Sequence, residues 1–253
     1  MIEKTSIVIP VYNHLYYTRQ ILGFIRRFTN VPHEIIVIDD HSRDGTPQFL
    51  KAISNKRYEN LVDFRVITNK KRMGVTYCWN VGMEAAYAKH VAVINNDIIL
   101  PPRWAEIILS VFRRDKNIKC VTPIELPRLT IEEYWEKAED LAKDYLMWEM
   151  ITRPPALPGG FTGACFVLRK DAWEKLEGFD IRYNLWFGDI DLFLRMQKIG
   201  WSTVQCLNVL MYHFCSKSVN ALPKYLDLFE KDKKLFYEQW PYCDSYRQYE
   251  GLI

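Results

Sequence analysis

The segment Ser6–Asn13 reads SIVIPVYN, an almost continuous apolar run that ends in the polar pair Tyr12-Asn13. Short apolar runs of this kind are typical of strands that are covered on both faces of a sheet. The residues Tyr17–Phe28 carry apolar side chains at helical spacing, so a helix is expected to follow. A strand followed by a crossover helix is the building unit of an α/β fold.

The same alternation continues along the chain. Further strands are predicted at Glu34–Ile38, Val62–Thr68, His90–Ile94, Cys120–Pro123, Ala164–Leu168 and Ser202–Val209. Further helices are predicted at Thr46–Ser54, Tyr77–Ala88, Ala105–Arg113, Ile131–Met150, Ile190–Ile199 and Pro223–Trp240, with a loop at Arg153–Gly160. We therefore expect an α/β fold with a mostly parallel, Rossmann-like sheet flanked by helices.

The composition is that of a globular protein without a strong charge bias. Of 253 residues, 49% are hydrophobic and 26% are charged, and the net charge of +3 is too small to indicate a nucleic-acid partner. The six cysteines include no CxxC pair and are expected to be reduced thiols. With no secretion signal and no apolar run of membrane-spanning length, a cytoplasmic protein is expected, and a peripheral membrane contact stays open.

Polar residues directly follow three of the predicted strands. They are the pairs Tyr12-Asn13 and Asp39-Asp40 and the triplet Asn95–Asp97. Because the carboxyl ends of parallel strands lie at one edge of a sheet, these residues are expected to meet beside one crevice, where such folds bind ligands.

The acidic pair Asp39-Asp40 has two interpretations. Adjacent carboxylates repel each other when they are desolvated, so their place after a buried strand indicates a ligand, and one acceptor suits the N3–H of uracil or thymine. Alternatively, Asp40, Ser42 or Asp44 caps the helix that begins near Thr46.

Two residues are candidate metal ligands. Asp97 offers the carboxylate oxygen that hard divalent cations prefer, although Asn95–Asp97 can also be a simple polar turn. His213 follows the apolar stretch Val209–Tyr212, and neutral imidazole binds Mn-like ions, but a lone histidine is more often structural. The glycine-rich stretch Gly159–Gly163 offers backbone amides to a ligand, which is a weaker signal.

Two carboxylates, Asp189 and Asp191, lie where the helix Ile190–Ile199 is expected to begin. Capping of the helix accounts for one of them. The other, next to the bulky Trp186 and Phe187, can be partly desolvated and serve as a general base. We favour Asp189 as the base and Asp191 as a structural or acceptor-orienting partner.

Seven motifs in a fixed order resemble those of a known family. They are IVIPVYN (7–13), VIDDHSRDGT (37–46), NVG (80–82), NND (95–97), GGFTGACFVLRK (159–170), GFD (178–180) and GDIDLFLR (188–195). Their order and spacing resemble the family 2 glycosyltransferases of the GT-A fold, the fold of nucleotide-diphospho-sugar transferases, over almost the whole chain.

The resemblance implies one GT-A domain over residues 1–253, with a nucleotide-binding half (1–100), a metal and acceptor half (101–215) and a C-terminal helical tail (216–253). It implies a nucleotide-sugar donor, a UDP- or dTDP-sugar. The residues assigned to this donor are Pro10, Tyr12, Asn13, Asp40, Asn96 and Asp97. It also implies Mn²⁺ or Mg²⁺ held by Asp97, with His213 as a second ligand.

By the same resemblance, Asp189 is the catalytic base that deprotonates an acceptor hydroxyl, so that the sugar is transferred with inversion. A glycan, a lipid-linked glycan or a protein fits the acceptor. The residues assigned to the acceptor side are Trp186, Phe187, Asp191 and Gly160, with Tyr145 and Trp148 as helpers. Packing in the core is nevertheless the more common role of any single aromatic residue.

Two residues depart from the family pattern. Asn96 stands where Asp is commoner, and Gly188 stands where many relatives carry Glu, so a weak metal requirement is compatible with this sequence. Two other functions stay open. A sugar-phosphate nucleotidyltransferase normally has a glycine-rich basic loop after its first strand, which Val11–His14 does not provide. A protein that binds carbohydrate or nucleotide sugar without turnover is the other.

Overall fold

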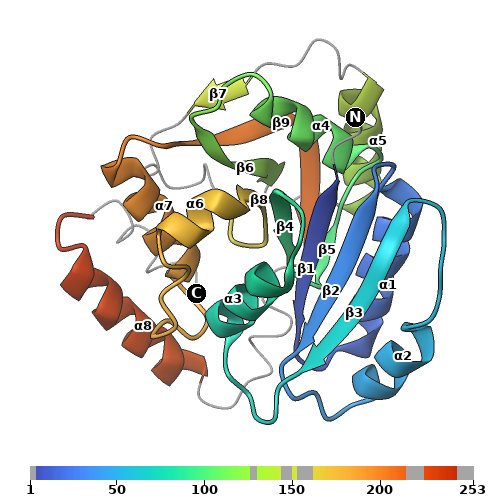
Figure 1. Cartoon of the computed structure of the whole chain (residues 1–253), viewed down its shortest axis with the longest axis horizontal. Coiled ribbons are helices and arrows are strands. Elements are labelled where there is room, and N and C mark those ends of the chain that lie inside the picture. Colours follow the sequence, from blue (N-terminus) through green and yellow to red (C-terminus); the bar gives the residue numbers. More distant parts are fainter. Residues whose placement is uncertain (1–3, 126–129, 144–149, 153–161, 215–224, 244–253) are drawn as a thin grey trace.

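The computed structural model describes residues 4–125, 130–143, 150–152, 162–214 and 225–243 (Figure 1). Its helices are α1 (Leu15–Phe28), α2 (Thr46–Ile53), α3 (Val75–Ala85), α4 (Trp104–Phe112), α5 (Ile131–Lys143), α6 (Lys170–Lys175), α7 (Gly188–Lys198) and α8 (Tyr225–Gln239). Its strands are β1 (Thr5–Val11), β2 (His33–Asp39), β3 (Leu61–Thr68), β4 (His90–Ile94), β5 (Ile98–Ile99), β6 (Ile118–Glu125), β7 (Met150–Thr152), β8 (Cys165–Arg169) and β9 (Ser202–His213).

The strands form one sheet in the order β3-β2-β1-β4-β8-β6-β9-β5, and β7 pairs with β9. The first four strands of this order are parallel, as predicted. β8 runs antiparallel to both β4 and β6, whereas β6 and β9 are parallel to each other. The ends of β1, β2, β4, β6 and β9 and the beginning of β8 therefore meet at one edge of the sheet, and the predicted α/β class is confirmed.

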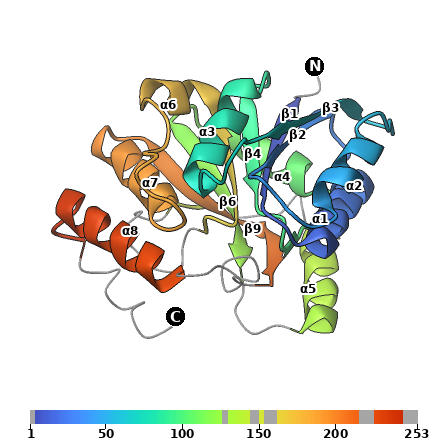
Figure 2. The same cartoon turned by 90° about the horizontal axis from the view of Figure 1, so that it is seen from below.

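Helices cover both faces of the sheet, which explains why its strands are apolar on both sides (Figure 2). Ile7 and Ile9 of β1 share a core with α1, α2 and α4, whereas Val8, which points the other way, packs with α3, α6 and α7. The helix α8 lies outside α7, away from the sheet. None of the helices in the described ranges is both long and apolar enough to cross a lipid bilayer.

Four elements differ from the sequence prediction. The predicted helix Ile131–Met150 corresponds to α5, which is described over Ile131–Lys143. Met150–Thr152 is instead a strand, β7, that pairs antiparallel with Cys206–Val204 of β9. That end of the prediction is wrong because helical periodicity carries no information about pairing with a distant strand. The two-residue β5 and the six-residue α6 were too short to be recognised from periodicity. The predicted loop Arg153–Gly160 lies outside the described residues, as do Tyr145 and Trp148.

A buried histidine lies at the first position of β4, far along the strand from the edge where the strands end. His90 is 2% exposed, its ring lies 4.5 Å from that of Phe112, and its Nε2 has no hydrogen-bond partner within the described part of the chain. Burial, with help from the nearby Lys89 and Arg169 charges, lowers the pKa of His90 to about 4.

We predict that His90 makes the fold sensitive to acid. Its pKa in the folded protein is below its unfolded value near 6.5, so the unfolded chain takes up the proton first as the pH falls. The associated stability is complete above pH ~6.5 and is lost on going towards pH 4. Between pH 7 and pH 4.5 the free energy of unfolding of the wild type should fall by roughly 2 kcal/mol more than that of His90→Gln. Urea unfolding at both pH values measures this, and equal losses in the two proteins would contradict it.

Candidate functional site

Asp97 and His213 lie side by side at the edge where the strands end. The short pairing of β5 with β9 sets Ile98 opposite His213, and the amide of Phe214 donates to the Asp97 carbonyl at 3.0 Å. As a result, His213 Nε2 is 3.5 Å from Asp97 Oδ1, and the Asp97 side chain is nearly buried. The two residues are separated by more than a hundred positions in the sequence, and the sheet alone brings them together.

The other nitrogen of His213 faces a carboxylate that the sequence analysis did not single out. His213 Nδ1 lies 3.2 Å from Oε1 of Glu125, the last residue of β6. Burial opposes ionisation of Glu125, but hydrogen bonds from His213 and from Thr162 hold the pKa of the Glu125 carboxyl below its usual range. With Nδ1 donating to Glu125, the Nε2 atom of His213 would be left to bind a metal ion beside Asp97.

Asp97 and His213 fit a divalent cation. Two ligands that are each about 2.1 Å from one ion are roughly 3–4 Å apart, and one carboxylate oxygen with one imidazole nitrogen suits Mn²⁺ or Mg²⁺. Within the described ranges, no three His, Cys, Asp or Glu side chains are arranged to hold a metal together. Asp97 and His213 alone are a partial ligand set, of the kind that substrate phosphate and water complete.

Asp189 belongs to the first turn of α7, and its carboxylate lies against Gly163. A Cβ added to Gly163 would overlap Asp189 Oδ2, so a glycine is required there by close approach. The next residue, Ala164, accepts a hydrogen bond from the Asn95 amide at 2.8 Å. Asp189 and the Asn95–Asp97 segment are thus on either side of residues 162–164, and not on opposite faces of the molecule.

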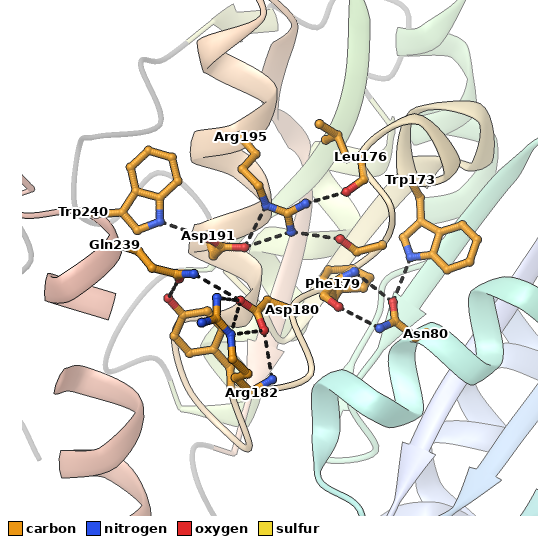
Figure 3. A network of polar contacts seen from close by, with 12 residues as sticks. Asn80, Trp173, Leu176, Phe179, Asp180, Arg182, Asp191, Arg195, Gln239 and Trp240 are labelled. Carbon is orange, nitrogen blue, oxygen red and sulfur yellow. Dashed lines mark hydrogen bonds and ion pairs between the residues drawn. The ribbon is translucent and has the colours of Figure 1, made fainter. Parts of the chain in front are cut away.

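The environment of Asp189 suits proton transfer. Burial raises the pKa of the Asp189 carboxyl, while the amides of residues 189 and 190 at the start of α7 act in the opposite direction. A carboxylate with a raised pKa is a stronger base than one in water. Asp191 is also buried, but its carboxylate already has partners. It forms an ion pair with Arg195 at 2.8 Å and accepts a hydrogen bond from Trp240 Nε1 at 3.0 Å (Figure 3).

Trp186 and Phe187 precede Asp189 and contact α8. The Phe187 ring stacks on Phe236, with centroids 4.8 Å apart, and Trp186 meets Phe229 edge-on at 5.2 Å. Phe187 has φ +65°, a left-handed conformation that is uncommon for a bulky residue. Gly160 lies outside the described residues, and the acceptor roles of Trp186, Phe187 and Asp191 stay predictions.

The residues predicted to bind the nucleotide follow β1 and β2. Asn13 has φ +55°; its amide donates to Ser42 Oγ at 2.8 Å, and its Oδ1 accepts from the Arg43 amide at 2.7 Å. The guanidinium of Arg72 lies over the Tyr12 ring, with its Cζ 4.9 Å from the ring centroid. Arg72 Nε is buried and has no partner in the part of the chain that the structure describes. Arg72 was not singled out from the sequence, because no motif marks it.

Asp40 is used inside the protein, but not as a helix cap. Its Oδ1 accepts from Asn69 Nδ2 and from the Met73 amide, both at 2.8 Å, and its Oδ2 accepts from the Gly74 amide at 3.0 Å. Asp44 instead accepts from the Thr46 amide at the start of α2, at 2.9 Å. Recognition of a base by Asp40 stays a prediction, and the hydrogen bonds give this carboxylate a further role in fixing the loop between β3 and α3.

Pro10 and Asn96 complete the predicted donor residues. Pro10, in β1, is paired with Ile38 of β2 one residue before the strand ends. Asn96 is 6% exposed, and its Nδ2 donates to Thr18 Oγ1 of α1 at 3.2 Å. Asn96 therefore ties the turn that contains Asp97 to α1, and its predicted role in donor binding is not tested by this arrangement.

Comparison with known proteins identifies a family and a curated relative. The family model described as Glycosyl transferase family 2 matches residues 6–176, a segment that ends before α7 and α8. The chain is 24% identical over 231 residues to chondroitin synthase of Pasteurella multocida (strain Pm70), which covers 91% of this chain but only 22% of that protein. The chain thus spans less than a quarter of the length of that curated relative.

Solved structures show the same fold. The mannosyltransferase PcManGT from Pyrobaculum calidifontis, in complex with GDP-Man and Mn²⁺, has a TM-score of 0.65 at 17% identity and covers 87% of this chain and 57% of that chain. GalNAc-T7 with UDP, GalNAc and Mn²⁺ has a TM-score of 0.66 at 14% identity and covers 96% of this chain and 51% of that chain. The predicted GT-A fold is confirmed by these likenesses.

The structure explains why position 188 is a glycine, and the explanation can be tested. A Cβ on Gly188 would overlap the Thr76 methyl group, whose hydroxyl donates to the Tyr183 carbonyl. Gly188→Ala should therefore lower the free energy of unfolding by about 1–3 kcal/mol, although alanine is the better helix former.

Thr76→Ser keeps the hydroxyl and removes the obstructing methyl, so Gly188→Ala should cost much less in that background. A double-mutant cycle measured by urea unfolding gives the coupling. An equal cost of Gly188→Ala in both backgrounds would show that the methyl group is not the obstacle.

Proposed function

This chain belongs to glycosyl transferase family 2, and we propose that it is an inverting, metal-assisted glycosyltransferase that moves a sugar from a nucleoside-diphosphate donor to a hydroxyl group. The observation that carries the proposal is the convergence around residues 162–164. Asp189 lies against Gly163, and the Asn95 amide donates a hydrogen bond to the Ala164 carbonyl. Thr162 forms a hydrogen bond with Glu125. Glu125 in turn contacts His213, which lies beside Asp97. A base and a pair of metal ligands thus flank one short segment.

Asp189 is the proposed general base. Its carboxylate accepts the proton of the acceptor hydroxyl while the acceptor oxygen forms a bond to the anomeric carbon. The bond from that carbon to the diphosphate breaks, and the nucleoside diphosphate leaves with the electron pair. Because attack and departure are on opposite sides of the carbon, the configuration inverts. The raised pKa of Asp189 supports this role, since a base is most effective when its pKa is near the working pH.

Asp97 and His213 are the residues that would hold Mn²⁺ or Mg²⁺, with Glu125 orienting His213 from behind. When bound, such a cation would neutralise the charge that develops on the leaving diphosphate. Both solved structures named above contain Mn²⁺, which supports a divalent metal here.

We assign the donor nucleotide to the half formed by residues 1–100, with Pro10, Tyr12, Asn13, Asp40 and Asn96. To these we add Arg72. Its guanidinium lies on Tyr12 and has a buried nitrogen without a partner in the described chain, so it is suited to a base carbonyl or a phosphate. A UDP- or dTDP-sugar is the proposed donor.

We assign the acceptor to residues 101–215, with Trp186, Phe187 and Asp191 on that side. The likeness to a chondroitin synthase supports a glycan acceptor. The hydroxyl that reacts must reach Asp189 beside Gly163.

The proposal is tested by incubating the protein with Mn²⁺ and a panel of UDP-, dTDP- and GDP-sugars, with and without short glycans. Release of nucleoside diphosphate that depends on the metal supports a glycosyltransferase. Release of pyrophosphate from a nucleoside triphosphate and a sugar phosphate would instead identify a nucleotidyltransferase. Binding of a donor without any release would identify a binding protein, and either of these results overturns the proposal.

Replacing Asp189 should separate chemistry from donor binding. We predict that Asp189→Asn lowers turnover by about 10²-fold or more, because the amide cannot take the proton. Its affinity for the donor should change by no more than a few-fold, as measured by titration with the donor and Mn²⁺. Asp171→Asn is a matched control, because Asp171 is exposed and pairs with Arg169 away from the site. Comparable turnover of Asp189→Asn and the wild type would remove Asp189 from its role.

Replacing Glu125 should weaken metal binding, although Glu125 is not one of the two proposed metal ligands. In Glu125→Gln the charge that fixes the His213 tautomer is lost, and we predict a 10–100-fold weaker affinity for Mn²⁺ in the presence of UDP. Titration calorimetry, or the Mn²⁺ electron paramagnetic resonance signal, measures this independently of turnover. Glu84→Gln, on the exposed surface of α3, serves as the control. Unchanged Mn²⁺ affinity in Glu125→Gln would show that Glu125 does not act through His213.

A further inference from the structure

A buried carboxylate of α8 holds the backbone in front of Asp189. Asp232 is fully buried, and its Oδ2 accepts hydrogen bonds from three successive amides: Asn184 at 2.9 Å, Leu185 at 2.8 Å and Trp186 at 3.1 Å. The Asn184 side chain also donates to Oδ1 at 3.4 Å. Residues 183–188, here called the aromatic turn, lead directly into Asp189.

A buried carboxyl group in this position is explained by the turn, and not by the packing of helices. Removing a carboxylate from water is costly unless hydrogen bonds replace the water, and apolar residues fill a helix interface at lower cost. The amides of residues 184–186 replace that water, and in doing so they are fixed in one arrangement relative to α8. The hydrogen bonds to Asp232 thus specify the backbone path of the aromatic turn.

Other residues of α8 and the segment after it hold both flanks of the turn (Figure 3). Gln239 accepts from the Tyr183 hydroxyl at 2.5 Å and donates to Asp180 at 3.2 Å, on the side before the turn. Trp240 donates to Asp191 at 3.0 Å, on the side after it. The segment between these contacts contains Asp189.

The aromatic turn is also docked on the loop that Asp40 holds. The Asn184 carbonyl accepts from the Val75 amide at 2.8 Å, and it lies 2.9 Å from the position of a Cβ on Gly74. Gly74, whose φ is +95°, donates in turn to Asp40. The turn is therefore clamped between two buried carboxylates, Asp40 on the donor side and Asp232 on the side of α8.

We infer that α8 positions the aromatic turn and that Asp232 is the positioning residue of α8. The hydrogen bonds of Asp232 fix where α7 begins and hence where Asp189 lies relative to Gly163. The inference rests on the proposed function only in giving Asp189 the proton transfer. Both α8 and the turn lie beyond the segment that the family model matches.

The test compares Asp232→Ala and Asp232→Asn with the wild type and with Thr29→Val. Thr29→Val is the matched control, because it also removes a buried hydrogen bond, from Trp104 Nε1 at 3.1 Å, but between α1 and α4. Amide hydrogen exchange of residues 184–186 is measured together with the kinetics of sugar transfer at saturating Mn²⁺.

We expect Asp232→Ala to lower kcat by about tenfold or more, as expected when a reacting group is misplaced, while the donor KM stays within about threefold. Exchange at residues 184–186 should be faster than in the wild type. Asp232→Asn, which keeps an acceptor oxygen, should recover part of both losses. Thr29→Val should lower the melting temperature to a similar extent without changing either quantity.

Unchanged kcat in folded Asp232→Ala, or an equal loss of kcat in Thr29→Val, would overturn the inference. If Asp232→Ala does not fold, Asp232→Asn alone carries the test, and wild-type kcat and exchange in that variant would count against Asp232. If the wild type transfers no sugar, the proposed function fails, and exchange then decides separately. Faster exchange at residues 184–186 supports the clamp, and unaltered exchange refutes it.

Discussion

The pairing of β8 with β4 is the constraint on which the site depends. β8 is antiparallel to β4, with Cys165 opposite Ile94, so β8 begins at the edge where β4 ends. A parallel strand at this position would bring its last residues to that edge instead. Because of this direction, residues 162–164 lie next to Asn95, and from there Thr162 reaches Glu125 and Gly163 admits Asp189. One change of strand direction therefore brings Asp97 and His213 close to the segment that contacts Asp189.

Several residues near this junction have left-handed or close-packed backbone. Asn13, Gly74 and Phe187 have positive φ, and Gly163 and Gly188 have no room for a side chain. Such conformations persist only where neighbouring contacts overdetermine them. For Phe187 these contacts are the rings of α8, and for the Gly74 loop they are the hydrogen bonds to Asp40. The rigidity of the site thus comes from buried polar and aromatic contacts as well as from the sheet.

The sequence predicted the sheet well because parallel strands covered on both faces are long apolar runs, and it placed Asp40, Asp97 and Asp189 after strands or at a helix start. It could not predict which distant groups meet them. Glu125 and Asp232 are ordinary acidic residues in a strand and a helix, and their roles follow from β6–β9 pairing and from the packing of α8 on the aromatic turn. Neither relation is periodic in sequence, so no local pattern records it.

The two departures from the family pattern have local physical causes that leave the reactive groups in place. At position 96 a carboxylate would be a second buried negative charge next to Asp97, whereas the amide is satisfied by Thr18. At position 188 any side chain would displace the methyl of Thr76. Both substitutions accommodate packing around α1 and α3. Asp97 and Asp189, the residues that follow them, keep their carboxylates at the shared edge. The departures therefore alter how the site is supported and do not remove the carboxylates that we propose to act in transfer.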